Sequence, residues 1–403
     1  MEWNYPLILD GATGTQLQKR GYTGAECAEK WVLEHPETIL DIQRRYVAAG
    51  SRVVYASTFG ANRIKLGEHG LGDKVEEYIE KLVALIREAA GDKALVAGDL
   101  SPVGKFLMPM GDITFEELVE VYARQASALE KAGVDLYVIE TMMTMAEARA
   151  AVLAVKSVSE KPVFVSFSCD SSGRTVMGTD VAAALVVMEG MGVDAFGLNC
   201  SAGPKEMLPQ LQRLSALAGI PLIAKPNAGL PQMEDGKTVY RCPPEEFTAW
   251  VEEMAVAGVC IFGGCCGTEE EHIAALAEKL KRVQPAAPAH SGEEVLCATE
   301  RDVFRPEEEE YLGVLECDED LGENIEDAQE DEEGILVIRV EDEDGLSCFE
   351  DCQWQIRQPL CLECEDAGLL EKALRAYQGR ALYRGNLPEA ELAPLKKKYG
   401  LLY

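Results

Sequence analysis

The sequence predicts a parallel (β/α)8 (TIM) barrel, followed by a small, acidic, partial α/β domain. Three observations predict this fold: apolar runs that recur at intervals of roughly 30–40 residues, helical patterns between these runs, and a sharp rise in acidic residues near residue 290. The 403 residues suffice for one barrel of about 250 residues and an appendage. An apolar share of 47% is ordinary for a chain with a full core and excludes a wholly disordered protein.

Eight short apolar runs, most of them β-branched, predict the barrel strands. In chain order they are Leu7–Ala12, Val53–Phe59, Ala94–Leu100, Leu136–Met142, Pro162–Ser168, Ala195–Ser201, Pro221–Ala228 and Val259–Cys266. Apolar residues at helical spacing separate the runs, and a glycine is expected to end the helix before several of them, at Gly50, Gly133, Gly192 and Gly258. Eight similar units favour a closed barrel over a doubly wound open sheet, which rarely needs so many.

The barrel is expected to occupy residues 1–284, because its final helix fits Glu269–Val283 and Pro285–Pro288 is typical of a linker. A linker over residues 285–295 and an acidic domain over 296–403 follow. About 110 residues cannot close a second barrel, and we expect part of the acidic region to be disordered. The tail patterns predict strands at Ile335–Val340, Pro359–Cys364 and Arg380–Tyr383, and helices at Leu369–Tyr377 and Glu389–Tyr399.

Charge and cysteine content exclude several classes of protein. The net charge is −32, and about 25 acidic residues against about 3 basic ones lie between Gly292 and Asp351, which argues against a nucleic-acid-binding face. Apolar stretches are too short for a membrane span and no signal-peptide pattern is present, so we expect a soluble, cytoplasmic protein. Thirteen cysteines in such a chain predict reduced thiols, and with only four histidines any metal site should be built from thiolates.

Three cysteines converge on the rim of the predicted barrel. Strand C-termini form the active-site face of such barrels, and Cys200 ends the sixth strand while Cys265 and Cys266 end the eighth. Adjacent side chains of a regular strand point to opposite faces, so the pair can bind one ion only where the neighbouring glycines let the backbone leave strand geometry. Three thiolates with one vacant tetrahedral position are typical of a catalytic zinc site, whereas the alternative is three cysteines packed as small apolar groups.

Five segments, in the order DGATGT, TFGAN, GLNCSAGP, KPNAGLP and GGCCGT, extend across the barrel. With them the first 283 or so residues resemble the homocysteine S-methyltransferase family, which includes the homocysteine-binding barrel of cobalamin-dependent methionine synthase. The resemblance implies one zinc ion held by Cys200, Cys265 and Cys266, with the homocysteine sulfur in the fourth position. One departure is Ser57, where the family segment TNTFGAN has an asparagine, and we expect it to alter the pocket wall only.

The chemistry of a zinc-bound thiol predicts the remaining contacts. Zinc removes the thiol proton, and three protein thiolates make the metal a weak Lewis acid that leaves the bound sulfur nucleophilic. The substrate ammonium needs a carboxylate, for which Glu140 and Asp10 are candidates, although each could instead be a cap or an ion pair. Backbone amides from Gly11 onward and Thr58 are candidates for the substrate carboxylate. Asn227 fits a binding role and a turn role equally well.

The sequence leaves the methyl donor and the tail open. No Asp-x-His-x-x-Gly cobalamin motif is present, so the first hypothesis is homocysteine methylation to methionine with methylcobalamin supplied by a separate corrinoid protein. Alternatives are another thiol acceptor, another donor (methylfolate, S-methylmethionine or betaine), or a non-catalytic zinc module that binds a partner. The segment Pro359–Tyr403 resembles the start of the pterin-binding barrel of methionine synthase, without implying folate binding. A second metal site is conceivable at Cys348, Cys352, Cys361 and Cys364.

Overall fold

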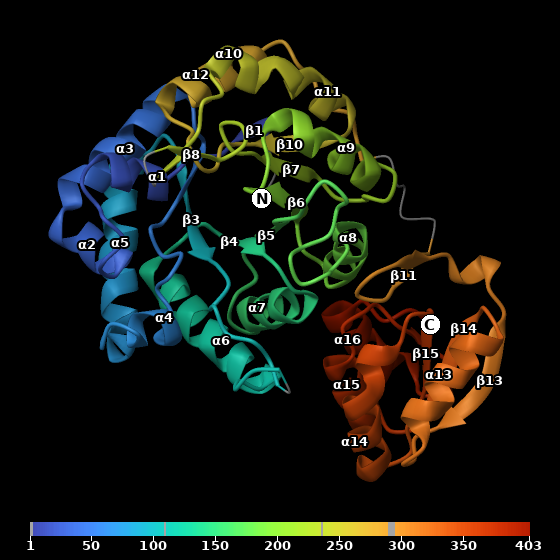
Figure 1. Ribbon diagram of the computed structural model, residues 1–403. Helices are drawn as coiled ribbons and strands as arrows, with labels where there is room; N and C mark the ends of the chain where they lie inside the picture. Colours follow the sequence, from blue (N-terminus) through green and yellow to red (C-terminus); the bar gives the residue numbers. More distant parts are fainter. Residues whose placement is uncertain (1–2, 109, 235–236, 289–294) are drawn as a thin grey trace.

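The computed structural model describes residues 3–108, 110–234, 237–288 and 295–403. Its largest sheet contains eight parallel strands: β1 (Leu7–Ile8), β2 (Val53–Tyr55), β3 (Leu95–Leu100), β4 (Leu136–Met142), β5 (Val163–Phe167), β6 (Ala195–Asn199), β7 (Leu222–Lys225) and β10 (Val259–Phe262). They pair in the order β1-β10-β7-β6-β5-β4-β3-β2. The Arg52 N–H donates to the Ile8 carbonyl at 2.7 Å, which joins β2 to β1 and completes the ring (Figure 1). The predicted (β/α)8 barrel is confirmed.

Helices surround this ring and begin and end where local chemistry dictates. Thr114 forms a capping box with Glu117 at the start of one helix, and Gly133 ends the same helix with φ of 81°. Gly50, Gly192 and Gly258 also have positive φ after helices. The barrel helices are α1 (Gly14–Lys19), α2 (Ala28–Glu34), α3 (Pro36–Ala49), α4 (Arg63–Gly67), α5 (Val75–Ala90), α6 (Phe115–Ala132), α7 (Met145–Val158), α8 (Val181–Gly190), α9 (Pro204–Ser215), α10 (Pro244–Phe247), α11 (Val251–Val256) and α12 (Glu270–Leu280).

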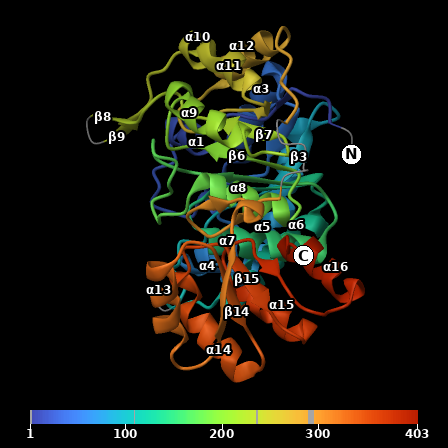
Figure 2. The same cartoon turned by 90° about the vertical axis from the view of Figure 1, so that its right-hand side faces the viewer.

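One antiparallel hairpin was not anticipated from the sequence. Strands β8 (Gln232–Glu234) and β9 (Lys237–Val239) follow β7 and extend away from the barrel body (Figure 2). Arg241, two residues after the hairpin, forms an ion pair with Glu234 of β8. The hairpin lies in the loop after a barrel strand, on the face where the site is expected.

The acidic tail is folded where the structure describes it, so the expectation of disorder was wrong for residues 295–351. Each amphipathic helix there buries one apolar stripe, such as Leu321 with Ile325 or Leu346 with Phe349, while the carboxylates face water. The predicted tail strands and helices were found, whereas three strands and two helices before residue 353 were missed: β11, β12, β13, α13 and α14. The elements are β11 (Cys297–Ala298), β12 (Val303–Phe304), β13 (Tyr311–Glu316), α13 (Leu321–Asp331), β14 (Ile335–Arg339), α14 (Glu343–Cys352), β15 (Leu360–Glu363), α15 (Ala367–Ala376), β16 (Leu382–Tyr383) and α16 (Glu389–Tyr399).

Strands β13 to β16 form a separate four-stranded parallel sheet in sequential order. One of its faces contacts the β11–β12 hairpin through a small cluster that includes Cys297, Ile335, Val337 and Cys361. The hairpin thereby covers apolar side chains on this face of the sheet. Residues 289–294 lie outside the described residues, so a linker over residues 285–295 and the two-domain division remain predictions. No described helix is long and apolar enough to cross a bilayer.

The tail packs against the outer surface of α7 and α8 (Figure 1). Residues Val181–Met188 of α8 are all buried, which is unusual for an outer barrel helix because one side normally faces water. Arg149 of α7 is 1% exposed and donates to the Leu374 and Arg375 carbonyls at the C-terminus of α15. The tail therefore buries apolar and charged surface of the barrel.

Candidate functional site

Three thiols lie together at the C-terminal end of the barrel. The sulfur atoms of Cys200, Cys265 and Cys266 are all within 4.8 Å of one another, and those of Cys200 and Cys266 are 3.9 Å apart. The loops after β6 and β10 carry them, two strands that are separated by β7. The structure thus brings together the three cysteines that the sequence singled out.

The glycines around the cysteine pair explain how adjacent residues reach one point. Strand β10 ends at Phe262, so Cys265 and Cys266 lie outside regular strand geometry, as the sequence predicted. A Cβ on Gly264 would lie 2.4 Å from the Thr268 hydroxyl, and Gly267 has φ of 81°. Backbone bonds from Cys265 N–H to the Pro226 carbonyl and from Ala228 N–H to the Cys266 carbonyl attach this loop to the one after β7.

The donor set fits a thiolate-binding metal such as zinc. Three sulfur donors from two loops leave one position of a tetrahedron open, and no carboxylate belongs to this group of possible ligands. The hydrogen bond with Cys200, together with burial, raises the pKa of Cys265 well above the usual value of a thiol. A cation would displace these thiol protons, so metal uptake at this site should release protons.

A cavity of about 300 Å³ lies beside the thiols. Its wall contains all three cysteines, Gly11 with the residues that follow it, Ser57, Phe59, Glu140, Thr141 and Lys225. At one side of the cavity the buried Lys225 ammonium lies 3.3 Å from Asp10 Oδ1 and 3.6 Å from Glu140 Oε2. The same ammonium lies 3.9 Å from the centroid of the Tyr55 ring. Thiol donors and a buried group of charges therefore share one small cavity.

Burial and neighbouring charges shift the pKa values of the ionisable side chains in this group. Burial alone would lower the pKa of Lys225, but Glu140 and Asp10 raise it well above its ordinary value, so the lysine is a cation. Burial, reinforced by Glu140, raises the pKa of Asp99 well above its ordinary value. Burial raises the pKa of Glu140 as well. In this buried group one ammonium lies against two acidic side chains, Asp10 and Glu140.

The predicted substrate contacts occupy different environments. Asp10 Oδ2 accepts hydrogen bonds from the Tyr55 N–H at 2.8 Å and from Gln43 at 3.2 Å, so Asp10 also joins β1 to β2. Glu140 Oε2 lies 3.6 Å from the Lys225 ammonium and forms no shorter hydrogen bond with the described residues, so Glu140 is the freer carboxylate. The Thr58 hydroxyl bonds to the main chain of Asp99 and does not line the cavity. Asn227 is buried, does not line the cavity, and leaves its Oδ1 without a partner among the described residues.

Sequence reasoning missed several residues of this site. Lys225 was part of a motif but was given no role, although a lysine at the end of a buried strand is itself a signal that carboxylates lie nearby. Asp99 also lines the cavity, whereas Ser57 lines it as expected from the sequence, in the pocket wall. Tyr240, which follows the β8–β9 hairpin, contacts Gly267 and hydrogen-bonds to the Cys266 thiol. Only the tertiary structure places the residue after this hairpin against the cysteine pair.

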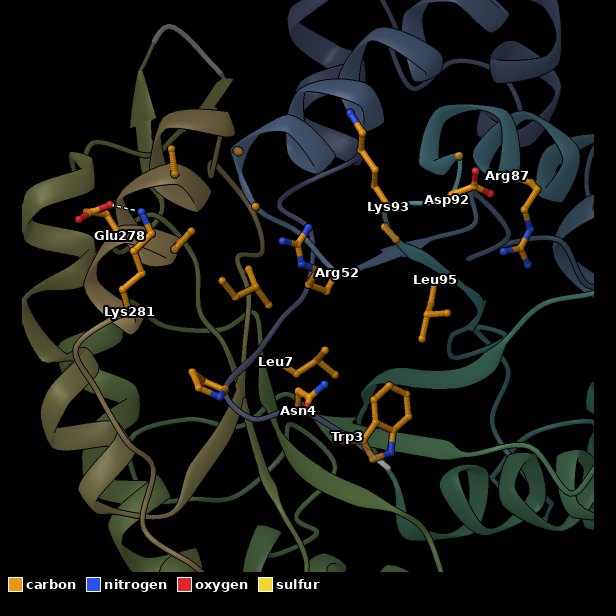
Figure 3. A pocket seen from close by; sticks show the side chains of 18 residues that line it. Trp3, Asn4, Leu7, Arg52, Arg87, Asp92, Lys93, Leu95, Glu278 and Lys281 are labelled. Carbon is orange, nitrogen blue, oxygen red and sulfur yellow. Dashed lines mark hydrogen bonds and ion pairs between the residues drawn. The ribbon is translucent and has the colours of Figure 1, made fainter. Parts of the chain in front are cut away.

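Two other features lie away from this chemistry. A larger hollow of about 910 Å³ opens at the N-terminal ends of β1 to β3, where Trp3, Arg52 and Lys93 line it (Figure 3). None of the candidate residues lines that hollow. In the described part of the tail the four cysteines do not form a metal-compatible group. Cys361 packs toward β11, whereas Cys352 and Cys364 belong to the core on the other side of the sheet.

Comparison with known proteins gives consistent results. Residues 7–280 match the family model described as homocysteine S-methyltransferase. A methionine synthase of Mycobacterium leprae is 33% identical to this chain over 68% of its length, and one of Mycobacterium tuberculosis is 32% identical over 69%. The chain spans about a quarter of the length of these curated relatives, 24% and 25% respectively. The metallated form of the homocysteine methyltransferase MmuM from Escherichia coli is 26% identical, with a TM-score of 0.59, over 68% of this chain and 96% of MmuM.

Proposed function

The chain belongs to the homocysteine S-methyltransferase family, and we propose that it methylates homocysteine to methionine with the substrate thiol activated at a zinc ion held by Cys200, Cys265 and Cys266. The observation that carries this proposal is the shared cavity, in which three thiols lie beside a buried group of one ammonium and two acidic side chains. Homocysteine has a thiol and an ammonium group, one for each part of the cavity.

Zinc, when bound, would remove the proton of the substrate thiol and keep the resulting thiolate nucleophilic. The chain's own residues orient the substrate. Glu140 Oε2 accepts a hydrogen bond from the substrate ammonium, and Lys225 keeps both neighbouring carboxylates in place. Gly11–Gly14 line the cavity, and their main-chain N–H groups would bind the substrate carboxylate, except that of Ala12, which donates to the Thr268 hydroxyl at 3.0 Å. Apolar wall residues such as Phe59 limit the access of water.

The source of the methyl group is a second part of the proposal. We propose methylcobalamin on a separate corrinoid protein as the donor, because the five sequence segments resemble those of cobalamin-dependent methionine synthase. The exposed acidic surface of the tail would then act on the rate of encounter with that protein, because exposed charges act mainly on association rates and partner choice.

The test uses the zinc-loaded 403-residue chain and homocysteine with one donor at a time: methylcobalamin, methylfolate, S-methylmethionine or betaine. Methionine formation with any donor supports the assignment as a methyltransferase, and the preferred donor shows which class of methyltransferase the protein belongs to. Cys265→Ser should abolish turnover and lose most of the zinc, whereas Cys242→Ser, which changes a cysteine outside the group of three, should retain both. Zinc and homocysteine binding without turnover on any donor would instead indicate a binding module.

A further inference from the structure

Thr141 has a backbone conformation that β-branched residues rarely adopt. Its φ is 61°, and the register between β4 and β5 shifts between Ile139 and Met142, so Glu140 and Thr141 lie in an irregular part of β4. Such irregularities next to active sites re-aim side chains. The direction of the neighbouring Glu140 carboxylate therefore depends on what holds Thr141.

Two hydrogen bonds with the side chain of Asn199, which lies two strands away at the end of β6, hold Thr141 in place. The Thr141 N–H donates to Asn199 Oδ1 at 2.9 Å, and Asn199 Nδ2 donates to Thr141 Oγ1 at 2.7 Å. Asn199 Oδ1 also accepts from the Ser166 hydroxyl of β5 at 2.9 Å. Asn199 is fully buried and does not line the cavity, so it acts on the site through other residues.

The same residue precedes the turn that places a thiol. Cys200 and Ser201 follow Asn199 with φ of 59° and 51°, and the Cys200 N–H donates to the Lys225 carbonyl at 3.1 Å. One buried side chain thus joins the irregular part of β4 that carries Glu140 to the end of β6 that carries Cys200. A side chain that served only strand pairing would have no reason to reach across β5.

We propose that Asn199 is a positioning residue that fixes the separation between the Glu140 carboxylate and the Cys200 thiol. It thereby selects substrates in which the thiol and the ammonium group are as far apart as they are in homocysteine. The inference rests on the proposed function, since it assigns the thiol and the ammonium of the substrate to these two groups. It adds a specificity determinant that touches neither the substrate nor the metal.

The experiment measures the affinity of zinc-loaded protein for homocysteine and for 4-mercaptobutyrate, the same thiol without the amino group. Asn199→Ala should weaken homocysteine binding by on the order of tenfold to a hundredfold. It should change 4-mercaptobutyrate binding by less than about threefold and leave zinc content unchanged. In a Glu140→Gln background the same substitution should cause little further loss, because the contact on which it acts is already gone.

Ser166→Ala is the matched control, because it removes a bond to the same Oδ1 atom without releasing Thr141, and it should reduce homocysteine affinity much less. If Asn199→Ala does not fold, Thr141→Val replaces it: this near-isosteric change removes only the bond to Oγ1 and should lower the preference for homocysteine several-fold. Equal losses for both thiols, or no loss in either variant, would overturn the inference alone. Wild-type protein that binds neither thiol refutes the proposed function, and the inference with it.

Discussion

Arg149 joins the tail to the barrel, and its replacement tests how tightly the two are coupled. Its guanidinium is buried and donates at 2.6 Å to the Leu374 carbonyl, at 3.2 Å to the Arg375 carbonyl and at 3.3 Å to Gln378 Oε1. Two of these acceptors are carbonyls at the C-terminus of α15, where the helix dipole favours a cation. Arg149→Met keeps most of the volume and removes every one of these bonds.

The expected loss follows from the groups left without partners. Each buried carbonyl without a partner costs about 1–3 kcal/mol, and two of them cost about 2–6 kcal/mol. Removing a buried guanidinium offsets part of this loss, because its own desolvation is no longer required. We therefore expect Arg149→Met to lower the free energy of unfolding by about 2–4 kcal/mol.

Urea unfolding followed by tryptophan fluorescence measures this change, since Trp354 reports on the tail and the other three tryptophans on the barrel. Arg44→Met is the control, because Arg44 forms an exposed ion pair with Glu88 and should contribute less than about 1 kcal/mol. A loss below about 1 kcal/mol for Arg149→Met would show that the two parts are only loosely coupled, and the reasoning from unpaired carbonyls would be wrong.

Four further outcomes are expected. Cys265→Ser should reduce zinc content well below one ion per chain by metal analysis, because two protein thiolates remain; full zinc would refute the ligand set. Glu140→Gln should weaken homocysteine binding by about 1.5–3 kcal/mol in calorimetry with zinc content unchanged, and equal affinity would make Glu140 structural. Burial raises the pKa of the Glu147 carboxyl, so the native state binds its proton more tightly than the unfolded chain does. The contribution of Glu147 to stability therefore falls as the pH rises above 4.5, and Glu147→Gln should flatten the resulting decline in the midpoint of thermal unfolding. A chain ending at Pro288 keeps every barrel strand but exposes α7 and α8, so we expect zinc binding with a lower melting temperature and self-association in light scattering; an unchanged, monomeric barrel would support independent domains.

The acidic tail shows where composition misleads. Like charges in a block predict disorder, yet helix α13 forms because Leu321 and Ile325 recur on one face and are covered by the tail sheet. That periodicity was present in the sequence, and the charge count obscured it. Similarly, Val181–Met188 is apolar on every side of α8, a local signal that something covers the outer surface of that helix.

By itself the sequence determined the barrel and the thiol group. Strands and helix-ending glycines depend on interactions within a few residues, so the local sequence predicts them. The glycines on both sides of the cysteine pair likewise indicate that the backbone there leaves strand geometry. Only the tertiary structure decided which partners those residues meet. Lys225, Asp10 and Glu140 come from three strands, and Asn199 reaches Thr141 across a fourth. Such contacts depend on the strand order and register of a closed ring, which bring together residues that are far apart in the chain.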